Sequence, residues 1–94
     1  MTDYLEPSLA THIQDVVCSC DGVAHLHSGQ FGEIALLYPG LRVPGLRLVA
    51  GRLEVHVVVK LTTGDLHQLA TTIRHAVSEL VDLPIDVTIG DVTI

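Results

Sequence analysis

Cysteine and histidine side chains gather in one short stretch of the sequence, "CSCDGVAHLH" at residues 18 to 27. Thiolates and imidazoles are the ligands that zinc and copper prefer. Residues two apart on a helix point about 200° apart around its axis, so Cys18 and Cys20 cannot share a metal ion unless the helix ends before Cys18. Because Cys20 continues the apolar stripe of the preceding residues, we expect Cys20 to be buried and Cys18 to be exposed.

Histidines form the second candidate group. His25 and His27 alternate with apolar residues, and in a β-strand their two imidazoles lie on the same face. His56 lies on the polar side of a later predicted strand. Because these residues match no recognised ligand spacing, we interpret them as surface or interface histidines and predict no metal site. A small metal-binding or metal-sensing protein that uses His25, His27 and His56, with Cys18 as a further ligand, is the alternative.

Other catalytic patterns are missing from the sequence. No serine stands in a G-x-S-x-G turn, and no G-x-x-x-x-G-K-[ST] loop could hold a phosphate. Asp82, Asp86 and Asp91 surround the last predicted strand, where we interpret them as solvated charges. We therefore predict no catalytic residues and no cofactor, and a protein that is not an enzyme.

The composition points to one small domain. The chain has 94 residues, of which 48% are hydrophobic and 17% charged, so a single core is expected over residues 1–94, after a flexible N-terminus of residues 1–7. The formal net charge of −6 argues against binding to nucleic acid. We find no signal peptide and no apolar run of the roughly 20 residues that a membrane span needs, which predicts a cytoplasmic protein without direct membrane insertion.

Hydrophobic periodicity gives the elements that must position these residues. A helix is predicted between Ser8 and Cys20, and a second helix carries an apolar stripe from Leu66 to Val81. Asp65 and Gln68 resemble a capping box at the start of the second helix. Strands are predicted over residues 23–28, 33–38, 46–49, 52–61 and 85–94, with a turn at Ala50 and Gly51 and a bulge at Gly90, where the alternation slips by one residue.

These elements predict an α+β fold in the order α-β-β-β-β-α-β. We expect a mixed sheet with both helices packed on one face, which leaves the other face open. On that open face we place Val58 beside the histidines, so the candidate interface residues are His25, His27, His56 and Val58. We expect this face or an exposed sheet edge to mediate self-association into a homo-oligomer.

The order of landmarks along nearly the whole chain resembles the alkaline-shock-protein family, and in particular its short actinobacterial members. These landmarks are "CDGVAHLHSG", "FGEIALLYPGLRVPGLRL", "GRLEVHVVVKL", "DLHQLATTIRHAVSEL" and "LPIDVTIGDV". They are turn glycines, alternating strands and an amphipathic helix, and they bring no active-site residues with them.

The resemblance implies a non-enzymatic scaffold or interaction protein of the bacterial cell-envelope stress response. Longer members of the family lie beneath the membrane, are tethered by a membrane-anchored partner protein and assemble into higher-order structures. This chain differs from those members because it lacks their extended polar tails. The resemblance therefore implies self-assembly more directly than it implies tethering to the membrane.

Overall fold

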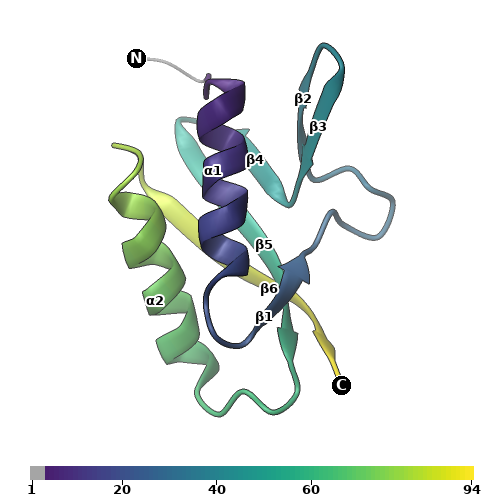
Figure 1. The fold of residues 1–94 in the computed structure, drawn as a ribbon, viewed down its shortest axis with the longest axis vertical. Coiled ribbons are helices and arrows are strands. Elements are labelled where there is room, and N and C mark those ends of the chain that lie inside the picture. The colour runs from purple at the N-terminus through teal and green to yellow at the C-terminus, as the bar shows by residue number, and fades with distance from the viewer. Residues whose placement is uncertain (1–3) are drawn as a thin grey trace.

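The structure is a computed structural model that describes residues 4–94. It contains two helices and six strands in the order α-β-β-β-β-β-α-β (Figure 1). The elements are α1 (Pro7–Cys18), β1 (Val23–Leu26), β2 (Ala35–Tyr38), β3 (Leu41–Pro44), β4 (Leu46–Val49), β5 (Arg52–Lys60), α2 (Leu66–Ser78) and β6 (Ile85–Thr93). The predicted α+β class is confirmed.

Strand β5 is the centre of a mixed four-stranded sheet. Along one of its edges, β4 pairs antiparallel with its first half and β1 pairs antiparallel with its second half. Along the other edge β6 runs parallel to it. The β5–β6 register shifts between Val57 and Val58, where Ile89 is followed by Asp91 as the next paired residue. The extra residue is Gly90, so the predicted bulge is confirmed.

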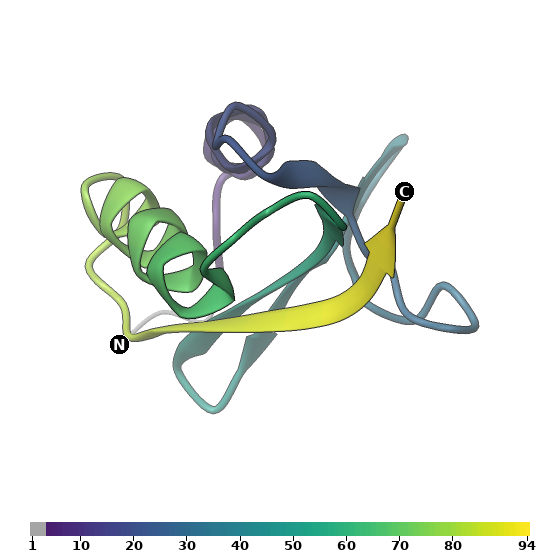
Figure 2. The ribbon, with the colours of Figure 1, turned by 90° about the horizontal axis from the view of Figure 1, so that it is seen from below.

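Both helices cover the same face of this sheet, as predicted (Figure 2). Along β5 the alternate residues Leu53, Val55, Val57 and Val59 are all fully buried and belong to the main core. From the helix side the core is completed by the buried stripes of α1 and α2, which are Ala10, Ile13, Val17, Leu69, Ile73 and Val77. Asp65 caps α2, since its side chain accepts a hydrogen bond of 3.1 Å from the backbone N–H of Gln68.

One strand was not predicted. Residues 41–44 form β3, which pairs antiparallel with β2 around the turn at Pro39 and Gly40 and makes a separate two-stranded hairpin. Figure 1 shows this hairpin projecting upward beside α1. The pattern missed β3 because Pro44 at its end and Gly45 directly before β4 are ordinary loop signals. Gly45 instead continues the chain into β4 with a positive φ of 86° and a hydrogen bond to the backbone of Ile34.

The N-terminal segment differs from the expectation of a flexible tail over residues 1–7. Pro7 begins α1, and Leu5 is buried in the core. The Tyr38 hydroxyl donates a hydrogen bond of 2.8 Å to the backbone carbonyl of Leu5. Residues 4 to 7 are therefore part of the folded domain, while residues 1–3 lie outside the described residues.

Candidate functional site

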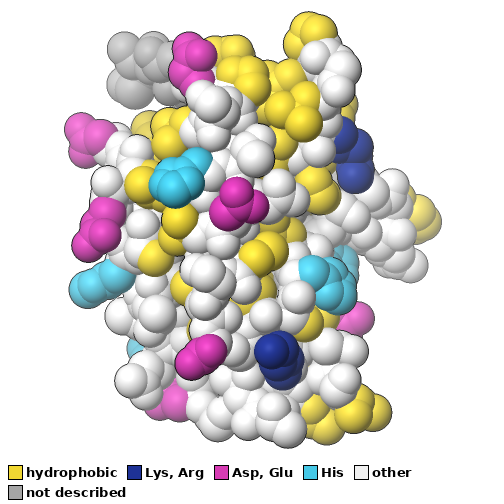
Figure 3. Space-filling view, in the orientation of Figure 1, with side chains coloured by type: hydrophobic (Ala, Val, Ile, Leu, Met, Phe, Trp, Pro, Cys, Tyr) yellow, Lys and Arg dark blue, Asp and Glu magenta, His cyan; other side chains and the backbone are white. Residues whose placement is uncertain are grey.

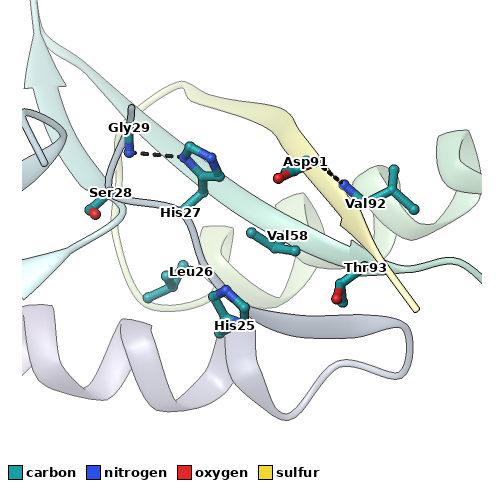
Figure 4. A pocket seen from close by; sticks show the side chains of 9 residues that line it. All are labelled: His25, Leu26, His27, Ser28, Gly29, Val58, Asp91, Val92 and Thr93. Carbon is teal, nitrogen blue, oxygen red and sulfur yellow. Dashed lines mark hydrogen bonds between the residues drawn. The ribbon is translucent and has the colours of Figure 1, made fainter. Parts of the chain in front are cut away.

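A hollow of about 360 Å³ lies on the sheet face away from the helices (Figure 4). Its lining comes from the end of β1, the segment after β1, the second half of β5 and the end of β6. The lining residues are His25, Leu26, His27, Ser28, Gly29, Val58, Asp91, Val92 and Thr93. This is the only place where the structure brings several of the sequence-predicted candidates together within residues 4–94.

Strand register builds the hollow. His25 pairs with Val58 across β1 and β5, and Val58 pairs with Asp91 across β5 and β6. Directly opposed residues of neighbouring strands lie on the same face, so an imidazole, an isopropyl group and a carboxylate form one row across the sheet. The bulge at Gly90 sets this row, because without the extra residue Gly90 would be the residue opposite Val58.

The ring of His27 lies over the backbone of β6. A Cβ atom added to Gly90 would stand 2.9 Å from Cγ of His27, closer than real Cβ contacts. The His27 ring is held from the other side, since its Nδ1 accepts a hydrogen bond of 2.9 Å from the backbone N–H of Gly29. Gly90 is therefore both the extra residue of the bulge and a position without a Cβ atom, which leaves room for the imidazole of His27.

His56 does not join the other two histidines. Its Nε2 lies 3.0 Å from Oε1 of Glu54, and the same carboxylate oxygen accepts hydrogen bonds from Nε and Nη2 of Arg47 at 3.0 and 2.8 Å. The contact with His56 and the Arg47 guanidinium hold the pKa of Glu54 below its usual range, although burial opposes them. The Arg47–Glu54–His56 group is a polar network along β4 and β5, separate from the hollow.

Two of the four predicted interface residues are covered by their own chain. Val58 is only 5% exposed and His56 only 9%, although both lie on the face that was expected to be open. The neighbours of Val58 in the hollow include His27, Ser28 and Gly29 of the segment after β1, whereas the His56 ring lies against Glu54. Of the predicted surface only His25 and His27 are left on the outside, with His25 exposed and His27 half-buried.

The residues that the metal-binding alternative would use are not assembled into one group. His25 and His27 share the hollow, but His56 lies in the other network, and no group of three or more His, Cys, Asp or Glu side chains within residues 4–94 is arranged to hold a metal ion. Cys18 is the last residue of α1 and is exposed, whereas Cys20 lies beyond the helix and is half-buried against the core. Burial raises the pKa of both thiols.

The sequence does not single out Glu54, the partner of His56. Asp91 is exposed, as expected of a solvated charge, but its place in the hollow is not predicted. The signal for Asp91 was present, because a bulge at Gly90 moves the next residue onto the row of Val58. Glu54 had a weaker signal, its position two residues before His56 on the same face of one strand.

No protein-family model, no curated protein and no solved structure matches this chain. No helix within residues 4–94 is long and apolar enough to cross a membrane.

Proposed function

We propose that this protein is a non-enzymatic scaffold or interaction protein of the envelope-stress type, as its resemblance to the alkaline-shock-protein family implies. In this proposal it works in the cytoplasm and assembles with itself or with a membrane-anchored partner protein. The observation that supports the proposal best is a set of large apolar side chains that the fold leaves in water.

Three of the exposed large apolar side chains within residues 4–94 lie on the β2–β3 hairpin or the segment before it, while others, such as Leu61 and Ile94, lie beyond the ends of β5 and β6. Leu37 in β2 is 75% exposed and Phe31 is 85% exposed, while Leu41 at the start of β3 is 39% exposed. In Figure 3 apolar side chains gather over the hairpin and beside it at the top of the molecule. Single exposed apolar residues are common, but several together on a projecting element are typical of protein–protein contacts.

The hollow over Val58 supports no second function. Catalytic zinc sites use three protein ligands. His25, His27 and Asp91 all line the hollow, but no three such side chains within residues 4–94 are grouped closely enough to hold a metal ion, and Nδ1 of His27 already accepts a backbone hydrogen bond. The metal-binding alternative would be favoured only if the untagged protein contained stoichiometric zinc or copper.

Analytical ultracentrifugation of the untagged protein over a wide concentration range tests the proposal. We expect concentration-dependent association, with fewer species larger than a dimer in Leu37→Ser. The matched control is Leu61→Ser, because Leu61 is also well exposed, at 61%, but lies beyond β5, away from the hairpin.

A monomer at every concentration would contradict self-assembly. Stoichiometric zinc or copper in untagged protein, lost when His25→Ala and His27→Ala are combined, would favour the metal-binding alternative instead.

A further inference from the structure

Strand β6 forms one whole edge of the main sheet, and the shorter strands β1 and β4 share the opposite edge. Strand β6 runs for nine residues beside β5, and no strand within the described residues pairs with its outer side. A strand edge of this length presents unpaired N–H and C=O groups that can pair with another strand, and many proteins block such edges.

The register shows which backbone groups of β6 point outward. In a parallel ladder alternate residues of a strand bond to the neighbour, and the residues between them bond away from it. The N–H of Leu53 donates to the carbonyl of Pro84 at 2.9 Å, and Leu53 pairs with Ile85. Asp86 and Thr88 therefore bond to β5, and the N–H and C=O groups of Ile85, Val87 and Ile89 point to the free edge.

Side chains of the same chain cap the two ends of this edge. At one end the Nε of Arg74 in α2 donates to the carbonyl of Ile85 at 3.3 Å. At the other end Oδ1 of Asp91 accepts from the N–H of Val92 at 2.8 Å. Between these caps no side chain of residues 4–94 bonds to the outward groups of Val87 or Ile89. The edge thus carries one side-chain bond at each end and is open in its middle.

The open part has a self-complementary pattern. If a second copy runs antiparallel with Val87 opposite the partner's Val87, Ile85 falls opposite the partner's Ile89 and Asp86 opposite the partner's Thr88. Ile85, Val87 and Ile89 pair with the core-facing residues of β5, so apolar side chains meet on the helix face. In an antiparallel ladder, opposed residues whose N–H and C=O groups point toward each other exchange two hydrogen bonds. In this register the pair of Val87 residues and the pairs of Ile85 with Ile89 would bond in this way.

The charges also fit this register. Asp86 forms two hydrogen bonds of 2.8 Å with Arg52 of its own chain, and the residue opposite it is the neutral Thr88 of the partner. Like charges directly opposite each other would be destabilising, and this arrangement avoids them although each chain carries a formal net charge of −6. Ile85's carbonyl has a second lone pair, so the bond from Arg74 does not exclude a bond from the partner.

We propose that a second copy of this chain occupies the β6 edge and forms a two-fold symmetric dimer with a continuous sheet, centred on Val87. The inference rests on the proposed self-assembly and assigns it to a surface distinct from the β2–β3 hairpin. Because the pairing is isologous, it closes on itself as a dimer, and the hairpin stays free for further contacts.

A charge series at Thr88 tests the register. Thr88 is exposed and lies on the face away from the core. Thr88→Asp places a carboxylate opposite the partner's Asp86 twice per dimer, and Thr88→Lys places an ammonium there. From the usual size of cross-strand charge pairs we expect a roughly three- to tenfold weaker dimer for Thr88→Asp and a stronger one for Thr88→Lys. Thr11→Asp and Thr11→Lys, exposed on α1, carry the same changes in net charge and should leave the dimer dissociation constant nearly unchanged.

Sedimentation equilibrium gives the dissociation constants, and circular dichroism checks that each variant is folded; if Thr88→Asp is unfolded, Thr88→Lys alone decides. If the wild type dimerises but the Thr88 variants behave like the Thr11 variants, the β6 inference is overturned while self-assembly stands. If the wild type is monomeric at all concentrations, both are overturned.

Discussion

At the scale of single residues, Gly90 lies close against the ring of His27 beside the hollow. A methyl group at residue 90 needs the space that the imidazole occupies. We expect Gly90→Ala to lower the free energy of unfolding by about 1–2 kcal/mol, in the range of overpacked sites. In a His27→Ala background the same change should cost less than about 0.5 kcal/mol.

Urea denaturation of the four proteins in this double-mutant cycle gives the coupling. An equal loss of stability from Gly90→Ala in both backgrounds would mean that the bulge itself, and not the ring of His27, requires the glycine.

The two cysteines differ in exposure more than in chemistry. The thiolate is the reactive form, and the raised pKa values reduce its population near neutral pH. We therefore expect slow alkylation at pH 7 that accelerates as the pH rises, with the exposed Cys18 modified before Cys20. Mass spectrometry after peptide digestion follows the two sites separately. Equal rates at both sites would show that the turn after α1 opens readily.

At the scale of elements, α2 has one face that is buried in the core. Ile73 is fully buried at its centre, and Thr72 beside it is exposed. We expect Ile73→Asp to abolish cooperative thermal unfolding, because an unpaired buried carboxylate costs several kcal/mol against a total stability of roughly 5–15 kcal/mol. Thr72→Asp should keep the melting temperature within a few degrees. Similar melting curves for the two variants would contradict the assigned face of α2.

Hydrophobic periodicity predicted the elements that carry long apolar stripes. It failed to predict the features that depend on contacts between segments distant in the sequence. The stripe of α2 and the alternation of β5 and β6 extend over nine or more residues each, which leaves one interpretation. The four-residue β3 has no such signal, because it exists through its pairing with β2. The burial of Val58 and His56 could not be predicted for the same reason, since it depends on neighbours from other segments or on side-chain contacts, such as Ser28 and Gly29 beside Val58 and Glu54 beside His56.

At the scale of the whole molecule, the fold separates two kinds of surface. One is the projecting β2–β3 hairpin with its exposed Leu37 and Phe31, and the other is the open middle of the β6 edge. A dimer that closes through β6 would display two hairpins, which gives a scaffold two further points of contact. The hollow with His25, His27 and Asp91 lies near the end of β6, so its side chains flank the dimer in this arrangement.

Amide hydrogen exchange in β6, followed residue by residue by NMR at low and high protein concentration, tests self-association through this edge most directly. The N–H groups of Asp86 and Thr88 bond to β5, so we predict slow exchange for both at every concentration. The N–H groups of Val87 and Ile89 point outward, and we predict fast exchange in dilute protein and at least tenfold protection once the dimer forms. Exchange at Val87 and Ile89 that stays equally fast from dilute to concentrated protein would contradict the account.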